Sequence, residues 1–106
     1  MNESMGNQKV IDIFENLSPY LQGLGDPVRQ RIISLLIDQE SMNVSQIAEH
    51  VPMSRPTVSH HLKILRQSGL LSVQKKGTEM YYKLEFNDAI ELLKQLVHLV
   101  EVECQS

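Results

Sequence analysis

Apolar residues recur every three or four positions along the first part of the chain, which is the spacing of an α-helix. From Lys9 onward they are Val10, Ile13, Phe14, Leu17, Leu21 and Leu24. We expect this helix to be bent or interrupted near Ser18 and Pro19, because an internal proline removes a backbone donor and collides with the preceding turn. The polar, glycine-containing residues 1–8 are expected to form a disordered tail.

A second helix is predicted directly after Gly25. Asp26 can cap its amino end, and Pro27 suits the first helical position, where the backbone N–H needs no partner. Arg29 and Gln30 are expected to face solvent. The core face of this helix is expected to consist of the apolar positions Val28, Ile32, Leu35 and Leu36.

A short helix over residues 45–50 is predicted to follow a polar break at residues 39–42. Pro52 ends it, because the residue before a proline is pushed out of the helical region. The residues of this segment that are expected to face the core are Ile47, Ala48 and Val51. Together with the helix that follows, it indicates a helix-turn-helix over residues 44–68.

The next helix is predicted from Ser54 to Ser68. Ser54 is a good N-cap, and Gly69 can take the left-handed conformation just past a helix end. A helical wheel places His61 at the edge of an apolar face made by Val58, Leu62 and Leu65. The opposite face holds Pro56, Ser59, His60, Lys63 and Gln67. It carries no carboxylate, which favours contact with the DNA major groove, where base edges offer donors and acceptors and phosphates line the rim.

Two short strands are predicted after this helix, over residues 70–74 and 80–84. In the second strand, Tyr81 and Lys83 are expected to point outward, and the residues expected to point inward are Met80, Tyr82 and Leu84. The turn between the strands is expected over Lys75, Lys76, Gly77 and Thr78. A helix-turn-helix followed by a lysine-bearing hairpin is the arrangement of a winged helix-turn-helix, whose hairpin contacts a neighbouring phosphate or minor groove.

The last helical pattern runs from Asn87 or Asp88 to about Glu103. It has more apolar positions than one intramolecular stripe needs, namely Ala89, Ile90, Leu92, Leu93, Leu96, Val97, Leu99, Val100 and Val102. We therefore expect the first and last helices to pack against a second copy of the chain in a two-fold interface. Such a homodimer would hold two recognition helices about one duplex turn, ~34 Å, apart on a palindromic operator.

Charge is distributed unevenly along the chain, which has a net charge of −3. Residues 54–83 contain six basic residues and one acidic residue, a local charge of +5. The remaining residues contain four basic and twelve acidic ones, a charge of −8. Affinity for a duplex follows the local field of the contacted face, because salt screens charges farther away than ~10 Å. We expect the acidic remainder to face away from DNA.

The 106 residues suffice for one domain, expected over residues 9–106, with an aliphatic core because only 5% of residues are aromatic. The chain has no apolar run long enough to span a membrane and no signal-like amino terminus, so we expect a cytoplasmic protein. The single cysteine excludes an intrachain disulfide framework. No enzyme is expected, because the sequence has no Gly-rich phosphate loop, Ser-His-Asp set or thiolate paired with histidine.

The runs GLGDPVRQRIISLL and SRPTVSHHLKILRQSGLLSVQKKGTEMYYKL resemble the ArsR family of small winged-helix bacterial repressors. The resemblance covers roughly Leu21 to the carboxyl terminus. It implies a homodimer, mainly α with a small β-hairpin, in which each chain has about five helices and a β-wing. It also implies a repressor that occupies an operator until a signal lowers its affinity.

The resemblance also implies which residues contact DNA. The residues that match the recognition helix of the family are Ser54, Arg55, Thr57, Ser59 and His60, with Lys63 toward phosphate. The residues that match its wing are Lys75, Lys76, Gly77 and Thr78. His61 also matches, and its place beside the apolar face predicts that it orients the helix and does not contact a base.

The inducing signal is left open by the sequence. One metal-sensing class of the family uses Cys-x-Cys before the recognition helix, and residues 44–49 contain no thiol. Another class uses the last helix, where His98 and Glu101 match half of a zinc site while residues 85–88 offer no imidazole. No cofactor is therefore expected, and a zinc-type repressor stays an alternative. Cys104 is a candidate for oxidation. A winged helix that binds another protein is the second alternative.

Overall fold

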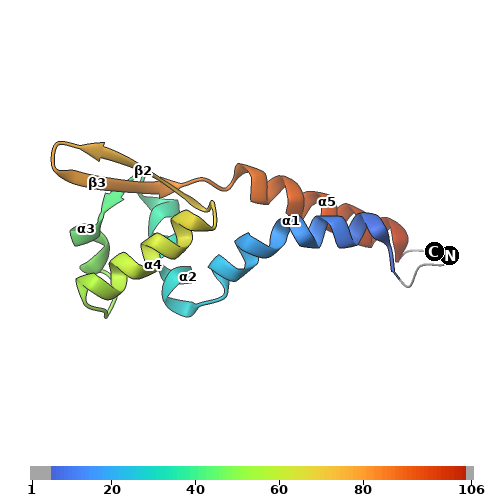
Figure 1. Ribbon diagram of the computed structural model, residues 1–106, viewed down its shortest axis with the longest axis horizontal. Helices are drawn as coiled ribbons and strands as arrows, with labels where there is room; N and C mark the ends of the chain where they lie inside the picture. The colour runs from blue at the N-terminus through green and yellow to red at the C-terminus, as the bar shows by residue number, and fades with distance from the viewer. Residues whose placement is uncertain (1–5, 105–106) are drawn as a thin grey trace.

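Five helices and three strands make up residues 6–104, the part of the chain that the computed structural model describes. In chain order they are α1 (Gln8–Leu24), α2 (Pro27–Asp38), β1 (Met42–Asn43), α3 (Val44–Ala48), α4 (Arg55–Gln67), β2 (Leu71–Lys76), β3 (Glu79–Leu84) and α5 (Asn87–Glu103). The molecule is elongated, with extents of 56 × 22 × 22 Å. Helices α1 and α5 lie side by side at one end, and the other elements form the opposite end (Figure 1). This architecture confirms the predicted winged helix-turn-helix.

Helix α1 runs through Pro19 as one continuous helix, so of the predicted bend or interruption near Ser18 and Pro19, the interruption is wrong. Pro19 lies on the exposed side of the helix, where water can bond the carbonyl that loses its partner. The helix also begins inside the expected tail, because Asn7 caps it by accepting from the backbone N–H groups of Lys9 and Val10. Residues 1–5 of that tail lie outside the described residues.

The main core is aliphatic and joins α2, α3, α4 and the sheet. Val58, Leu62 and Leu65 of α4 are fully buried in it, which confirms the predicted inner face of this helix. Truncating such a leucine to alanine typically costs 2–5 kcal/mol, so this face holds α4 in place. The other core residues are Ile32, Ile33, Leu36, Met42, Ile47, Val51, Leu70, Leu71 and Ala89.

The sheet has three antiparallel strands in the order β1-β3-β2. Residues 39–42 were expected to be a polar break, but Met42 is buried in β1 and pairs with Tyr82 of β3. A two-residue strand has no periodicity to detect, so only the pairing reveals it. Asn43 then caps α3 and exchanges side-chain bonds with Gln46 in a capping box.

The hairpin turn is shorter than predicted. Lys75 and Lys76 belong to β2, and Lys76 pairs with Glu79, which leaves only Gly77 and Thr78 in the turn. Gly77 has a φ of +64°, a left-handed conformation that suits such two-residue turns. Because the hairpin extends past the core, Met80 is exposed rather than inward, while Tyr82 and Leu84 pack against the core as predicted.

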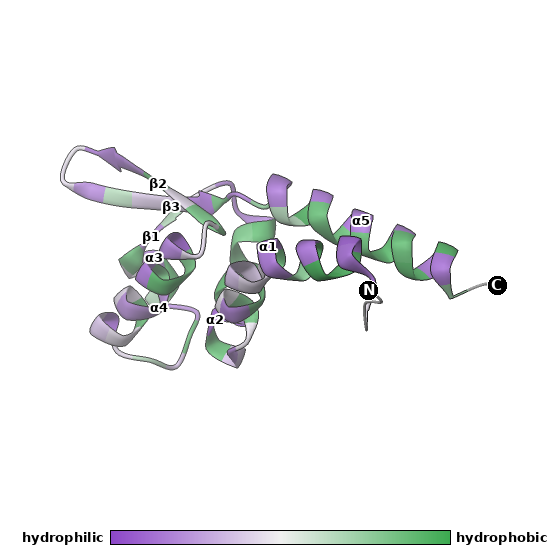
Figure 2. Cartoon of the chain, turned by 45° about the vertical axis from the view of Figure 1, so that its right-hand side comes forward, coloured by the Kyte–Doolittle hydropathy of each residue, from purple (hydrophilic) through white to green (hydrophobic). Residues whose placement is uncertain are grey.

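Helices α1 and α5 pack together with few buried side chains. Ile13 and Leu17 are buried on α1, and Ala89 is the buried residue of α5. Figure 2 shows hydrophobic residues along both helices, and many of these are exposed: Ile11, Phe14, Leu21, Ile90, Leu93, Val97, Val100 and Val102. Within the described residues, no helix combines the length and apolar character that membrane crossing requires.

Candidate nucleic-acid interface

The ends of α4 are fixed by local chemistry. At its amino end, the Ser54 hydroxyl accepts from the Thr57 backbone N–H at 3.4 Å and donates to Thr57 Oγ1 at 3.0 Å. At its carboxyl end, Gly69 takes a φ of +84°, as the sequence predicted. Both hydroxyls at the start of α4 are therefore partly engaged with each other, and Thr57 is half-buried.

The outer face of α4 is free of the protein core. Ser59, His60 and Lys63 are all exposed, and so is Arg55 in the first turn. Helix α3 packs against α4 on its inner side. The two helices therefore form a helix-turn-helix whose second member presents a hydroxyl, an imidazole and an ammonium group to solvent. These groups match the donors and acceptors of base edges and the phosphates beside them.

The hairpin carries its predicted site residues as exposed side chains on two different faces. Adjacent residues of a strand point to opposite sides, so Lys75 shares a face with Val73 while Lys76 shares a face with Tyr81. The ammonium nitrogen of Lys76 lies 5.2 Å from the centroid of the Tyr81 ring, a cation–π distance. Thr78 is exposed in the turn. The two lysines are therefore not equivalent, although the sequence grouped them in one turn.

Positive charge concentrates on α4 and the hairpin, which lie away from the paired helices α1 and α5 (Figure 1). Every basic side chain between Ser54 and Lys83 is exposed, namely Arg55, Lys63, Arg66, Lys75, Lys76 and Lys83. Glu79 is the one acidic residue in this stretch. This surface attracts a polyanion, whatever the net charge of the whole chain.

Arg29 is placed differently from the prediction that it faces solvent. It is half-buried, and its guanidinium donates to the carbonyl oxygens of Gln22 and Gly23 at 3.2 and 2.7 Å. A third guanidinium nitrogen lies 3.3 Å from Nδ1 of His61 on α4. No pattern in the sequence predicts these contacts, because they depend on how α1, α2 and α4 pack together. His61 borders the core beside this group, as predicted.

Asp26 caps α2 beside this group, as predicted. Its carboxylate accepts from the backbone N–H of Val28 at 2.8 Å and of Arg29 at 3.1 Å. The backbone bond from Arg29, together with the bond from Val28 and the nearby charge of Arg29, outweighs the effect of burial and lowers the pKa of Asp26. The cap is therefore in its charged, accepting form at neutral pH.

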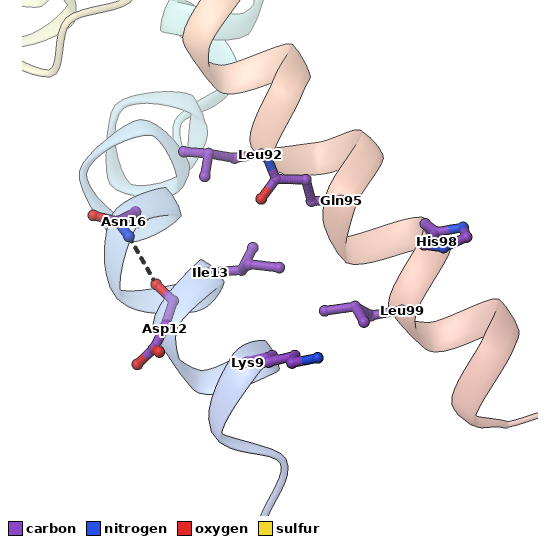
Figure 3. Close-up of a pocket in the computed structure, with 8 residues that line it drawn as sticks. All are labelled: Lys9, Asp12, Ile13, Asn16, Leu92, Gln95, His98 and Leu99. Carbon is purple, nitrogen blue, oxygen red and sulfur yellow. Dashed lines mark hydrogen bonds between the residues drawn. The ribbon is translucent and has the colours of Figure 1, made fainter.

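The candidate metal ligands lie on α5 and are exposed. His98 borders a groove of about 430 Å³ between α1 and α5, in which Ile13 and Leu99 point toward one another (Figure 3). His98 and Glu101 also line a second, shallower groove on α5. Within the described part of the chain, no three His, Cys, Asp or Glu side chains gather as a metal site. Cys104 is exposed with a free thiol.

The fold and this surface define a winged helix-turn-helix protein, a class of DNA-binding transcription regulators. Residues 26–73 match the family model described as bacterial regulatory protein, arsR family. The chain is 33% identical over 93 residues to the arsenical resistance operon repressor of Staphylococcus xylosus, covering 86% of this chain and 88% of that one. The chain belongs to the arsR family of bacterial regulatory proteins.

Two further comparisons concern a helix-turn-helix regulator and the fold. The chain is 33% identical over 81 residues to the uncharacterized HTH-type transcriptional regulator MJ1325 of Methanocaldococcus jannaschii, covering 76% of this chain and 91% of that one. Its fold is similar to the solved structure of an ArsR-like transcriptional regulator from Rhodococcus sp. RHA1, with a TM-score of 0.79 and 22% identity. That likeness covers 90% of this chain and 86% of the other.

Proposed function

We propose that this chain is a transcriptional repressor that binds a palindromic DNA operator as a homodimer in the cytoplasm. The observation that carries the proposal is the exposed, carboxylate-free face of α4 beside a basic hairpin. Relatives over most of this length are named repressors, which supports repression as the outcome of binding. A protein that covers an operator blocks transcription without needing an active site.

In this proposal, the residues divide between base edges and phosphates. Ser59 and His60 lie at the centre of the outer face of α4 and contact base edges. Thr57 and the capping residue Ser54 lie at the amino end of α4, where backbone N–H groups favour a phosphate. The residues that contact phosphates through positive charge or the wing turn are Arg55, Lys63, Lys75, Lys76 and Thr78.

The second copy of the chain is proposed to cover the exposed apolar side chains of α1 and α5. Phe14 on α1 is 46% exposed and Val97 on α5 is 54% exposed, so the intramolecular contact leaves these side chains largely uncovered. A two-fold interface places the same patch on both subunits and would bury it. Because α1 and α5 lie opposite the hairpin end, such a dimer would leave both α4 helices free for DNA (Figure 1).

A binding experiment at several salt concentrations tests the proposal. If each subunit neutralises about three or four phosphates, the slope of log K against log salt is roughly −5 to −7 on duplex DNA. Lys75→Ala is expected to weaken binding to all sequences alike, whereas Ser59→Ala and His60→Ala change which sequence is preferred. A slope near zero, or identical effects of the two groups of variants, would contradict the assigned interface.

A further inference from the structure

Arg29 bonds to the carboxyl end of α1 although it belongs to α2. Its Nε donates to the Gly23 carbonyl at 2.7 Å, and its Nη2 donates to the Gln22 carbonyl at 3.2 Å. Carbonyl groups in the last turn of a helix lack intrahelical partners and carry partial negative charge. The guanidinium therefore satisfies the end of α1 with two charge-assisted bonds.

The third contact of Arg29 is with a histidine on α4. Its Nη1 lies 3.3 Å from Nδ1 of His61. Because a guanidinium only donates, this contact is a hydrogen bond only when the imidazole is neutral, with Nδ1 as the acceptor and the proton on Nε2. The contact therefore favours that tautomer and one orientation of the ring. His61 follows directly after Ser59 and His60, the residues proposed to contact bases.

Close packing at the carboxyl end of α4 adds a second contact between α1 and α4, and we call these two contacts together the α1–α4 joint. A methyl group added at Gly23 would lie 2.8 Å from the Ser68 hydroxyl and 2.9 Å from a methyl carbon of Leu70, just past the end of α4. The ring of Tyr20 likewise lies over Gly69, with 3.3 Å to a Cβ built there. The position of α4 relative to α1 is therefore fixed by contact at its carboxyl end and by Arg29 at His61.

We propose that Arg29 is a positioning residue for DNA recognition. Its bonds to the carboxyl end of α1 and its contact with His61 hold α4 in a fixed position relative to α1. The inference rests on the proposed function, in which α1 belongs to the dimer interface and α4 contacts bases. In that arrangement the α1–α4 joint determines the distance and orientation between the two recognition helices of the dimer. A loosened joint would lower affinity for a site of fixed half-site spacing more than affinity for arbitrary DNA.

The test compares Arg29→Gln with Arg31→Gln, which removes the same charge from an exposed position on the same helix. The probes are a duplex selected from a random pool by the wild-type protein and a duplex of mixed sequence. Arg29→Gln is expected to weaken binding to the selected duplex about tenfold, or 1.4 kcal/mol, and binding to the mixed duplex less than about twofold. Arg31→Gln is expected to change both by less than about twofold.

Nitrogen NMR of the imidazole separates positioning from a general loss of stability. The wild-type His61 is expected to show an acceptor Nδ1 and a protonated Nε2, and Arg29→Gln a mixture of tautomers. His61→Asn keeps an acceptor near the place of Nδ1 and is expected to retain more selective binding than His61→Gln. Melting curves of all variants identify any that fail to fold, and Arg29→Lys then serves as the milder substitute.

Any of three results overturns the inference alone. The first is wild-type selectivity in Arg29→Gln, the second is a wild-type spectrum with the proton on Nδ1, and the third is an equal loss on both duplexes. A wild-type protein that selects no duplex instead refutes the proposed function and this inference with it. An equal loss on both duplexes, in proportion to lowered melting temperature, shows that Arg29 only stabilises the fold.

Discussion

Gly23 decides how closely α1 approaches the end of α4. The Cβ of an alanine there would come within 3.0 Å of Ser68 Cβ as well as the Leu70 methyl, and the fully buried Leu70 has no room to move. Overpacking typically costs 1–3 kcal/mol, against up to about 1 kcal/mol gained in helix propensity. We expect Gly23→Ala to lower the free energy of unfolding by about 1–2 kcal/mol, measured by urea denaturation.

Gly25→Ala is the matched control for this prediction. The nearest atom to an added Cβ there is the Leu21 carbonyl oxygen at 3.4 Å, an ordinary contact. Its effect is expected within about 0.5 kcal/mol of wild type. Equal stability of Gly23→Ala and Gly25→Ala would show that α1 and α4 accommodate the added methyl group without losing free energy of unfolding.

Residues whose role depends on near neighbours in sequence are predictable, and those that join distant segments are not. Ser54, Asp26 and Gly69 act at helix ends through groups within three residues, so the sequence identifies them. Arg29 contacts residues six and seven positions earlier and His61 on another helix. Its role emerges only when three helices meet, which is why a helical wheel placed it toward solvent.

At the scale of elements, periodic segments are predictable and short ones are not. The apolar faces of α4 and α5 span several turns, and both helices end within about a residue of their predicted bounds. The two-residue β1 exists because Met42 pairs with Tyr82, a contact 40 positions apart. Pro19 does not interrupt α1, because the burial of Ile13 and Leu17 helps to hold the helix together.

Glu79 in the hairpin opposes the binding that its neighbours favour. It is exposed, lies across from Lys76, and is the one acidic residue between 54 and 83. Removing its charge should relieve repulsion of about 0.2–1 kcal/mol from phosphates, the size of a surface charge interaction. We expect Glu79→Gln to tighten DNA binding up to about fivefold at low salt, measured by fluorescence anisotropy, with the gain vanishing at high salt.

Glu91→Gln on α5 makes the same charge change in the other half of the molecule and controls for net charge. Its affinity is expected to stay within about twofold of wild type at about 0.1 M salt, where charges beyond ~10 Å are screened. If both variants tightened binding equally, the hairpin would not be close to DNA and the whole-molecule charge would decide affinity.

At the scale of the whole molecule, a basic surface and an apolar surface lie at opposite ends. The basic end carries α4 and the hairpin, while the other end exposes apolar residues on α1 and α5 (Figures 1 and 2). The sequence predicts both surfaces from composition and periodicity. It does not predict the elongated shape, which arises because α1 and α5 pack on each other and extend past the main core.

Val97 tests whether that apolar end is a subunit interface. Val97→Asp would place an unpaired carboxylate in the proposed interface, which typically costs 2–5 kcal/mol. The dimer dissociation constant is expected to rise about a hundredfold, measured by sedimentation, and affinity for the selected duplex to fall with it. The fold should persist, because Val97 is 54% exposed in the single chain.

Ile37 provides the control for this experiment, since it is 67% exposed at the end of α2, a helix that the proposed interface does not include. Ile37→Asp makes the same chemical change and is expected to leave both dimerisation and DNA affinity unchanged. A monomeric wild type would remove the interface from the proposal. A dimeric Val97→Asp with normal affinity would place the subunit contact on another surface, and the apolar end would then need a different partner.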